Sequence, residues 1–210
     1  MSNVRRRMSD QRKLWRLNVG GNRFLGLRPH DLSYFNVYFN GGEIETPWSP
    51  PPISISGKSK KLPDFVSWMM GAPVVSESAK DALLTLVGDT VQFLPFHALK
   101  GRPYYALNVV EVLHNLLDEA HSELSRFSSD GTIFSIDRAV FLEPLPTTLP
   151  PMFKLGEGAG GIFVTTPFAE LVVERQLTGV QLLAPSQHIL RLLLGREAHN
   201  AYPGTPPTDA

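Results

Sequence analysis

The chain has 210 residues, with 20 Lys and Arg against 20 Asp and Glu, 42% hydrophobic residues and no cysteine. This length and hydrophobic content suffice for a buried core and exclude a wholly disordered chain. The absence of cysteine excludes a disulfide scaffold, thiol catalysis and a Cys-ligated metal site, and we expect a reducing cytoplasm as the location. No window reaches the roughly 18 consecutive apolar residues of a membrane span, and the first residues lack the apolar segment of a signal peptide, so we expect neither.

Opposite charges are separated along the chain. Residues 1–61 carry 11 basic and 4 acidic side chains, whereas residues 62–175 carry 7 basic and 14 acidic ones. Three interpretations are open: two faces of one domain that compensate each other, a basic arm for nucleic acid, or an acidic surface for a basic partner. Residues 1–13 have the composition of a flexible tail without an aromatic-rich or helix-turn-helix pattern, so we do not expect them to bind nucleic acid.

Hydrophobic periodicity and turn residues predict a mixture of strands and helices. In the first half of the chain we expect strands over 14–19 and 34–39, an exposed loop over 48–61, a short helix over 63–70, an extended segment over 73–75, a helix from Ser76 or Ser78 to Gly88, and strands over 91–94 and 103–108. In the second half we expect a helix over 109–124, a turn over 128–131, strand structure over 132–136 and 139–142, and a proline-rich connection over 144–151. A hairpin of 152–155 with 162–165, a helix over 166–176, a strand over 180–183 and a last helix over 186–199 follow.

These elements do not repeat as βαβ units, which favours an α+β fold in which mainly antiparallel sheet segments carry several short helices. We expect residues 1–13 to be a basic flexible arm, residues 14–199 to form a single domain with its exposed loop near 48–61, and residues 200–210 to be a disordered tail.

The glycine-rich stretch from Gly156 to Gly161 satisfies the G-x-G-x-x-G pattern of phosphate-binding loops. Such loops lead into a helix whose N-terminus binds the phosphate, whereas this one leads into the β-branched and aromatic run 162–165. We therefore interpret it as a hairpin loop and expect no cofactor.

Three residues have the spacing of metal ligands on a helix. His114, Asp118 and His121 would share one face if 109–124 were an unbroken helix, and imidazole and carboxylate groups suit zinc or iron. The pattern is not H-E-x-x-H, so a polar helix face is the simpler interpretation and we assign no metal site. A small metal-dependent enzyme that uses these three residues remains the alternative.

Nucleophilic catalysis finds little support in the sequence. Cysteine is absent, no G-x-S-x-G elbow occurs, and Ser76, Ser78 and Ser122 suit caps or turns. The neighbouring carboxylates Asp118 and Glu119 would point apart on a helix, so they do not form an acid and base pair. We assign no catalytic residue and expect that the protein is not an enzyme.

Acidic residues are concentrated in one part of the chain. Residues 111–137 contain six carboxylates, and the only basic residues in or next to this segment are Arg126 and Arg138. The simplest interpretation is a solvated face, and the functional one is a surface that meets the phosphate-binding cleft of a basic protein. The candidate partner-binding residues are Glu111, Asp118, Glu119, Glu123 and Asp130.

A series of short motifs extends over residues 62–183. In chain order they are Leu62-Pro63-Asp64-Phe65, Pro73-Val74-Val75-Ser76-Glu77, Val91-Gln92-Phe93-Leu94-Pro95, Tyr104-Tyr105-Ala106-Leu107-Asn108-Val109, Leu117-Asp118 with Ser122, Pro151-Met152-Phe153-Lys154-Leu155 and Leu177-Thr178-Gly179-Val180. This order resembles immunity family eleven of bacterial polymorphic toxin systems, first catalogued as a domain of unknown function, and the first 60 residues match only loosely.

The resemblance implies an antidote that binds a toxin encoded beside it and blocks that toxin without catalysis. It implies no toxin class and no catalytic residues. The acidic residues suit a nuclease toxin in the cytoplasm, because a nuclease needs a basic active site. Inhibition of a co-expressed secreted protease is a related alternative. The sequence leaves the oligomeric state open.

Overall fold

The computed structural model describes residues 14–21, 23–31, 39–45, 47–57, 59–69, 71–157 and 161–187. Thirteen strands, two α-helices and one 3-10 helix lie in these ranges. In chain order they are β1 Leu14–Val19, β2 Gly26–Pro29, β3 Ile53–Ser56, β4 Phe65–Met69, β5 Ala72–Ser76, α3 Glu77–Val87, η1 Gly88–Thr90, β6 Val91–Pro95, β7 Tyr104–Val109, β8 Val112–Leu113, β9 Glu123–Arg126, β10 Ile133–Arg138, β11 Met152–Leu155, β12 Phe163–Thr165, α4 Thr166–Glu174 and β13 Val180–Leu183.

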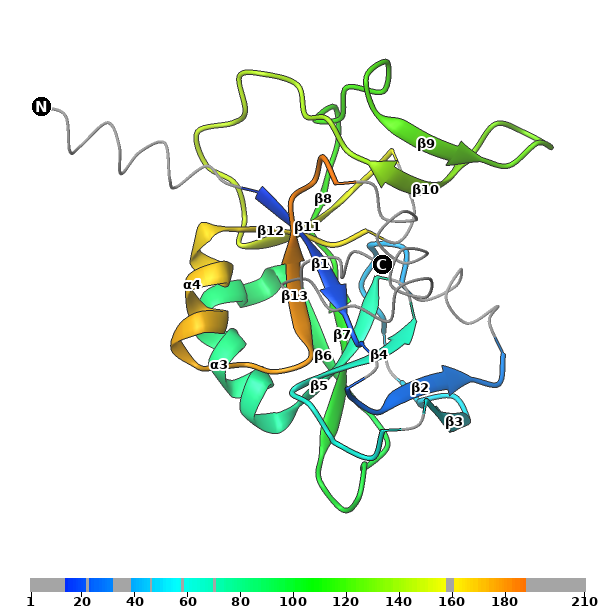
Figure 1. Ribbon diagram of the computed structural model, residues 1–210, viewed down its shortest axis with the longest axis vertical. Helices are drawn as coiled ribbons and strands as arrows, with labels where there is room; N and C mark the ends of the chain where they lie inside the picture. Colours follow the sequence, from blue (N-terminus) through cyan, green and yellow to red (C-terminus); the bar gives the residue numbers. More distant parts are fainter. Residues whose placement is uncertain are drawn as a thin grey trace, which may run out of the picture.

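Two larger sheets form the body of the molecule. One has the strand order β13-β1-β12-β11-β8, and the other has the order β4-β5-β7-β6. Neighbouring strands are antiparallel except β8 and β11, which run parallel. The helices α3 and α4 lie together on one side of these sheets (Figure 1). The expected α+β class therefore holds broadly, but the described chain is mostly β and does not contain several short helices.

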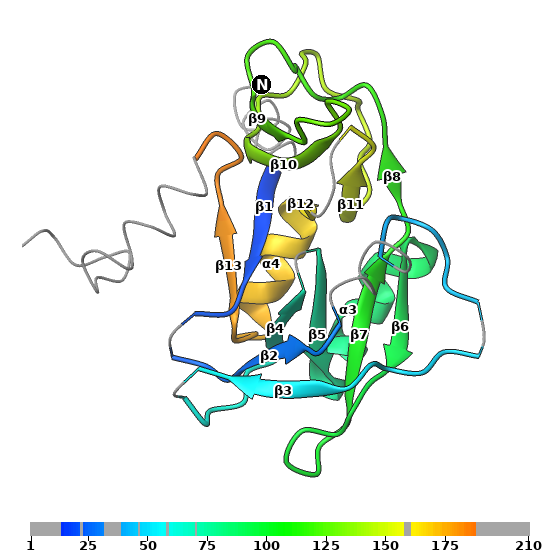
Figure 2. The ribbon, with the colours of Figure 1, turned by 90° about the vertical axis from the view of Figure 1, so that its right-hand side faces the viewer.

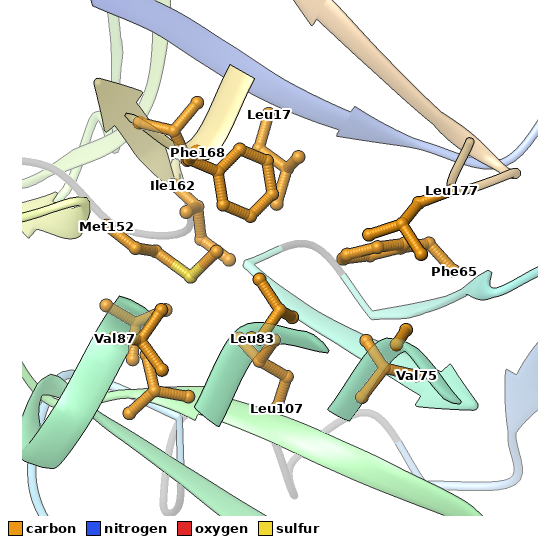
Figure 3. Packing of buried hydrophobic residues seen from close by; sticks show 14 residues of the cluster. Leu17, Phe65, Val75, Leu83, Val87, Leu107, Met152, Ile162, Phe168 and Leu177 are labelled. Atoms are coloured by element: carbon orange, nitrogen blue, oxygen red, sulfur yellow. The ribbon is translucent and has the colours of Figure 1, made fainter. Parts of the chain in front are cut away.

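The central hydrophobic core lies between the two larger sheets and the helices. Phe65 of β4, Leu83 of α3 and Phe168 of α4 are fully buried in it, and Figure 3 shows Met152 and Ile162 lying over Leu83 and Val87. Because the core residues extend from Leu17 of β1 to Leu177, the core joins segments far apart in sequence.

Two further clusters extend the core outward. One lies beneath the two-stranded sheet of β2 and β3 and contains Val66 and Trp68 of β4. The other contains Phe153 and Phe163, from β11 and β12, and the apolar face of the β9–β10 hairpin. Each larger sheet is thus covered by side chains on both faces.

Helix α3 begins and ends as its sequence predicts. Ser76, rather than Ser78, is the N-cap, and its Oγ accepts a hydrogen bond from the amide of Ala79 at 3.2 Å. Gly88 follows the helix with φ of 51°, a conformation that glycine adopts readily.

Most other predicted elements are also present. The described residues confirm the strands over 14–19, 91–94, 103–108 and 180–183, the extended segment over 73–75, the turn over 128–131, the hairpin of 152–155 with 162–165 and the helix that begins at Thr166. The strand over 34–39 lies largely outside the described residues, and so do the helix over 186–199, the arm over 1–13 and the tail over 200–210.

Two predicted helices are wrong, and one predicted loop contains a strand. Within the predicted helix 63–70, Phe65–Met69 form strand β4, which is buried on both faces and therefore lacks the alternation that distinguishes a strand from a buried helix. Residues 109–124 end β7, form β8 and continue as turns up to β9. Strand β3, paired with β2, lies within the predicted loop 48–61.

Candidate partner-binding surface

The candidate acidic residues lie mainly beside and on the β9–β10 hairpin. This hairpin lies at one end of the molecule in both views (Figures 1 and 2). The segment that precedes it is held alongside residues 140–142, since the amide of Asp118 donates to the carbonyl of Val140 at 2.9 Å and Leu117 forms a bridge with Phe141. The segment and the hairpin therefore form one structural unit, residues 116–142.

Buried side chains fix this unit to the five-stranded sheet. Ile133 and Ile136 of β10 are buried against Phe153 and Phe163. A hydrophobic contact of this kind orients the hairpin but leaves its other face free for charged residues.

A buried arginine adds a polar connection. Arg16 of β1 is only 6% exposed, and its Nη1 donates to the carbonyl oxygen of Ile136. Burial lowers the pKa of Arg16 to about 10, an effect that the nearby charge of Asp137 opposes. Asp137 is buried too and accepts hydrogen bonds from Ser125 at 2.6 Å and Ser135 at 2.8 Å. Asp137 therefore belongs to the support of the hairpin and not to its exposed surface.

Two of the candidate carboxylates pair with arginines of the same hairpin. Glu119 Oε2 lies 2.6 Å from Arg126 Nη2, and Glu123 Oε1 lies 2.8 Å from Arg138 Nε. Both pairs are solvent-exposed, so each contributes little to stability, but each neutralises part of the acidic charge. The unit 116–142 retains more carboxylates than arginines, and its surface remains acidic.

The other two candidate carboxylates of the unit, Asp118 and Asp130, organise local turns. A hydrogen bond from His121, whose Nδ1 lies 2.7 Å from Oδ2, lowers the pKa of Asp118. The backbone amide of Thr132 donates to Asp130 at 2.9 Å and lowers its pKa. Both carboxylates therefore stay ionised to a lower pH than an ordinary aspartate does.

Glu111 lies apart from these four residues. Its amide donates to the carbonyl of Thr90 at 3.4 Å, and its carbonyl accepts from the amide of Lys154 of β11 at 2.8 Å. These contacts place it in the body, between β7 and β8. The structure thus brings together four of the five candidate residues.

The helical face proposed for a metal does not exist. Asn115 has φ of 58°, which interrupts any helix between His114 and Asp118. Asp118 and His121 contact each other, whereas His114 packs against Gly156 at the end of β11. Within the described ranges, no group of three or more His, Asp or Glu side chains is arranged to hold a metal ion.

The glycine-rich stretch connects β11 to β12, as a hairpin loop would. Its residues 158–160 lie outside the described part of the chain. Gly156 has a packing reason to be glycine, because a Cβ at this position would overlap the ring of His114. The strand β12 that follows offers no helix N-terminus to a phosphate.

Sequence reasoning missed an aromatic pair on the same hairpin. Phe127 is 54% exposed and Phe134 is 39% exposed, and their ring centroids lie 4.8 Å apart. The only signal in the sequence is two phenylalanines that flank the turn 128–131, and a buried position would give the same signal.

The described residues thus define an α+β protein that has an acidic hairpin at one end. The chain belongs to the immunity protein family Imm11, whose model matches residues 4–184. The match also includes residues 4–60, although the first 60 residues resemble the family only loosely by motif. Strand β1, in this part of the chain, lies inside the five-stranded sheet. No curated protein matches the chain.

Membership in this family supports a toxin-neutralising immunity role and implies a toxin as partner. It also suggests a non-enzymatic inhibitor. None of the helices in the described part of the chain has the length and apolarity that a membrane crossing requires.

Proposed function

We propose that this protein binds a cognate toxin in the cytoplasm as a stoichiometric partner and blocks it, and that the toxin is a nuclease. The observation that carries the proposal is the family match over residues 4–184. In the unit 116–142, Glu119 and Glu123 pair with arginines and Asp130 accepts a hydrogen bond from a turn amide, and we assign these carboxylates to binding.

The nuclease assignment rests on the charge of the unit 116–142. Nucleases need cationic clefts to hold a phosphate backbone, and an acidic protein surface is attracted to the same cleft. Asp118, Glu119, Glu123 and Asp130 supply that surface. Such long-range attraction raises the association rate and selects the partner more than it raises affinity.

Glu111 enters the proposal as a separate residue, because its contacts lie in the body. Its substitution tests whether the toxin covers β8 as well as the hairpin. If the contact is confined to the unit 116–142, Glu111→Gln will bind the toxin as the unmodified protein does.

Co-purification tests the function directly. The tagged protein is expressed with the products of its immediate gene neighbours, and we expect one neighbour to elute at a 1:1 ratio and to be lethal when it is expressed alone. Nucleic-acid degradation by that neighbour, abolished by one equivalent of this protein, would support the nuclease assignment. A lethal partner with a different activity would contradict the nuclease assignment but support the antidote function. The absence of a stoichiometric partner would contradict both.

A further inference from the structure

Two aromatic rings stand exposed and in contact on the β9–β10 hairpin. Six large hydrophobic residues in the described part of the chain are exposed, and they are Ile55, Leu84, Phe127, Phe134, Leu142 and Val173. Phe127 and Phe134 are the two aromatic residues of this set, and their rings are tilted by 43° at a centroid separation of 4.8 Å. Single exposed apolar residues are common on protein surfaces, but a contiguous aromatic pair often marks a contact site.

The hairpin does not need these rings for its own core. On the same strand β10, Ile133 and Ile136 are 7% and 2% exposed and pack against the body, whereas Phe134 turns to solvent. Phe127 lies at the start of the turn, outside both strands. The hairpin thus presents its largest apolar side chains where folding alone gains least from them.

Hydrogen bonds close the turn that carries the rings. The amide of Phe127 donates to the carbonyl of Thr132 at 2.9 Å, and the amide of Gly131 donates to the carbonyl of Phe127 at 3.0 Å. Arg126 Nη1 donates to the carbonyl of Gly131 at 3.0 Å. Because the backbone and the ring pair are already ordered, a partner that covers them loses little conformational entropy.

The charge around the rings identifies the kind of partner. Between Asp118 and Arg138 the chain carries four carboxylates that are not buried and two arginines, a net charge of −2 with histidine neutral, and the fifth carboxylate, Asp137, is buried. A second copy of this surface would bring like charges together, whereas a cationic surface would complement it. The aromatic pair and its acidic border therefore match an apolar recess surrounded by Lys or Arg side chains.

We propose that Phe127 and Phe134 together are the apolar anchor of the complex and insert into such a recess on the toxin. This inference rests on the proposed function and adds to it the residues that contribute most of the affinity. Aromatic residues at the centre of an interface contribute in this way, while charged residues at the rim mainly accelerate association.

The test compares two double variants in binding to the toxin recovered by co-purification, made inactive by substitution in its own active site. Phe127→Ser with Phe134→Ser should raise the Kd by about 100-fold, mainly through faster dissociation. The matched control, Ile55→Ser with Val173→Ser, removes two exposed apolar residues from β3 and α4 and should change the Kd by less than about 3-fold. Thermal melting of both variants checks that they are folded.

The outcomes separate this inference from the function on which it rests. If the unmodified protein binds the toxin and the double phenylalanine variant binds it equally well, the anchor is wrong and the function stands. If the unmodified protein binds no toxin, both fall. Ultracentrifugation of the protein alone adds a third arm, because a dimer that the phenylalanine variant dissociates would assign the rings to self-association instead.

If the double phenylalanine variant does not fold, amide hydrogen exchange in the unmodified protein, measured with and without the toxin, tests the proposal instead. We expect the toxin to slow exchange of the amides between Leu124 and Ser135, with little change in β2 and β3. Unchanged exchange in the hairpin would overturn the proposal.

Discussion

Thr178 donates two hydrogen bonds to one oxygen of Asp64, a residue 114 positions earlier in the chain. The backbone amide and the Oγ1 of Thr178 lie 2.8 Å and 2.7 Å from Oδ2. The amide of Asp64 in turn donates to Thr178 Oγ1 at 3.0 Å. These bonds fasten the start of β4 to the segment between α4 and β13.

The second oxygen of Asp64 extends the network to helix α3. Ser76 Oγ, which caps that helix, donates to Asp64 Oδ1 at 3.0 Å, and the amide of Ser76 donates to the carbonyl of Asp64 at 2.8 Å. Three of the motifs that resemble the immunity family therefore meet at one carboxylate. In this structure the hydrogen bonds between the three motifs stabilise the fold.

Loss of the Asp64 carboxylate should destabilise the protein. Asp64→Ala leaves the Thr178 amide and the Ser76 and Thr178 hydroxyl groups without this acceptor, and we expect a loss of about 2 kcal/mol in the free energy of unfolding, measured by urea denaturation. Asp81→Ala is the control, because the ion pair that Asp81 forms among the described residues is a long contact of 3.8 Å to Lys80 at the surface. Equal stability of the two variants would show that the network contributes nothing.

Gly179 should tolerate no side chain. It has φ of 82°, and a Cβ at this position would overlap the carbonyl oxygen of Phe65. We expect Gly179→Ala to cost about 3 kcal/mol in the free energy of unfolding, because backbone strain adds to a steric overlap. Gly131→Ala separates the two effects, since Gly131 has φ of 74° and open space around it. That control should cost only about 1 kcal/mol, and a similar loss in both variants would contradict the overlap.

Lys154 should make stability depend on pH. It is 3% exposed, its Nζ donates to the carbonyl of Phe39 at 2.6 Å, and burial lowers its pKa from 10.5 to about 8. Below pH 8 both folded and unfolded chains carry the proton, so the folded state bears the full cost of the buried charge. Between the two pKa values the unfolded chain binds more protons, and stability therefore rises with pH until the cost disappears.

A variant isolates this effect from other titrations. The free energy of unfolding of the unmodified protein, relative to that of Lys154→Met, should rise by about 3 kcal/mol between pH 7.5 and pH 10.5. Subtraction removes contributions such as that of Tyr104, whose pKa burial raises. A difference that does not change with pH would mean that the ammonium group is not desolvated in solution.

The acidic hairpin should govern how fast the toxin binds. Asp118→Asn with Asp130→Asn removes two charges, and we expect the association rate to fall by about 10-fold at low salt and to become less sensitive to salt. Arg126→Gln should act in the opposite direction, because it frees the carboxylate of Glu119 from its ion pair. Stopped-flow measurement at two ionic strengths checks both variants.

A charge change on another face controls for the net charge of the protein. Asp81→Asn with Glu174→Gln removes two exposed charges from α3 and α4. If this variant slows association as much as the hairpin variant does, then the overall charge matters and the hairpin has no special role.

Local sequence signals determined several elements of this protein by themselves. Helix α3 has its cap at Ser76, its apolar stripe and its final Gly88 within thirteen consecutive residues. The turn over 128–131 and the hairpin of β11 with β12 are equally local. Each of these signals depends on contacts between residues that are near in sequence, so the sequence contains all the information that they need.

The secondary structure of other segments could be assigned only from the tertiary structure, because their apolar residues pack into more than one hydrophobic cluster. In β4, Phe65 points into the central core while Val66 and Trp68 point into the outer cluster under β2 and β3, and a strand buried on both faces has the same apolar pattern as a buried helix. In 109–124, Val109 belongs to the central core, and Leu116 and Leu117 belong to the cluster below the hairpin. Their helical spacing is therefore a coincidence, because the partners that fix each side chain come from distant strands.

The same reason explains the candidate surface. The sequence predicted its acidic residues, since charge can be counted along the chain. It did not predict that Glu111 lies apart, that Arg126 and Arg138 neutralise two carboxylates, or that Phe127 and Phe134 are exposed together. Exposure and pairing depend on which side of the hairpin packs against Phe153 and Phe163, and only the folded body determines that side.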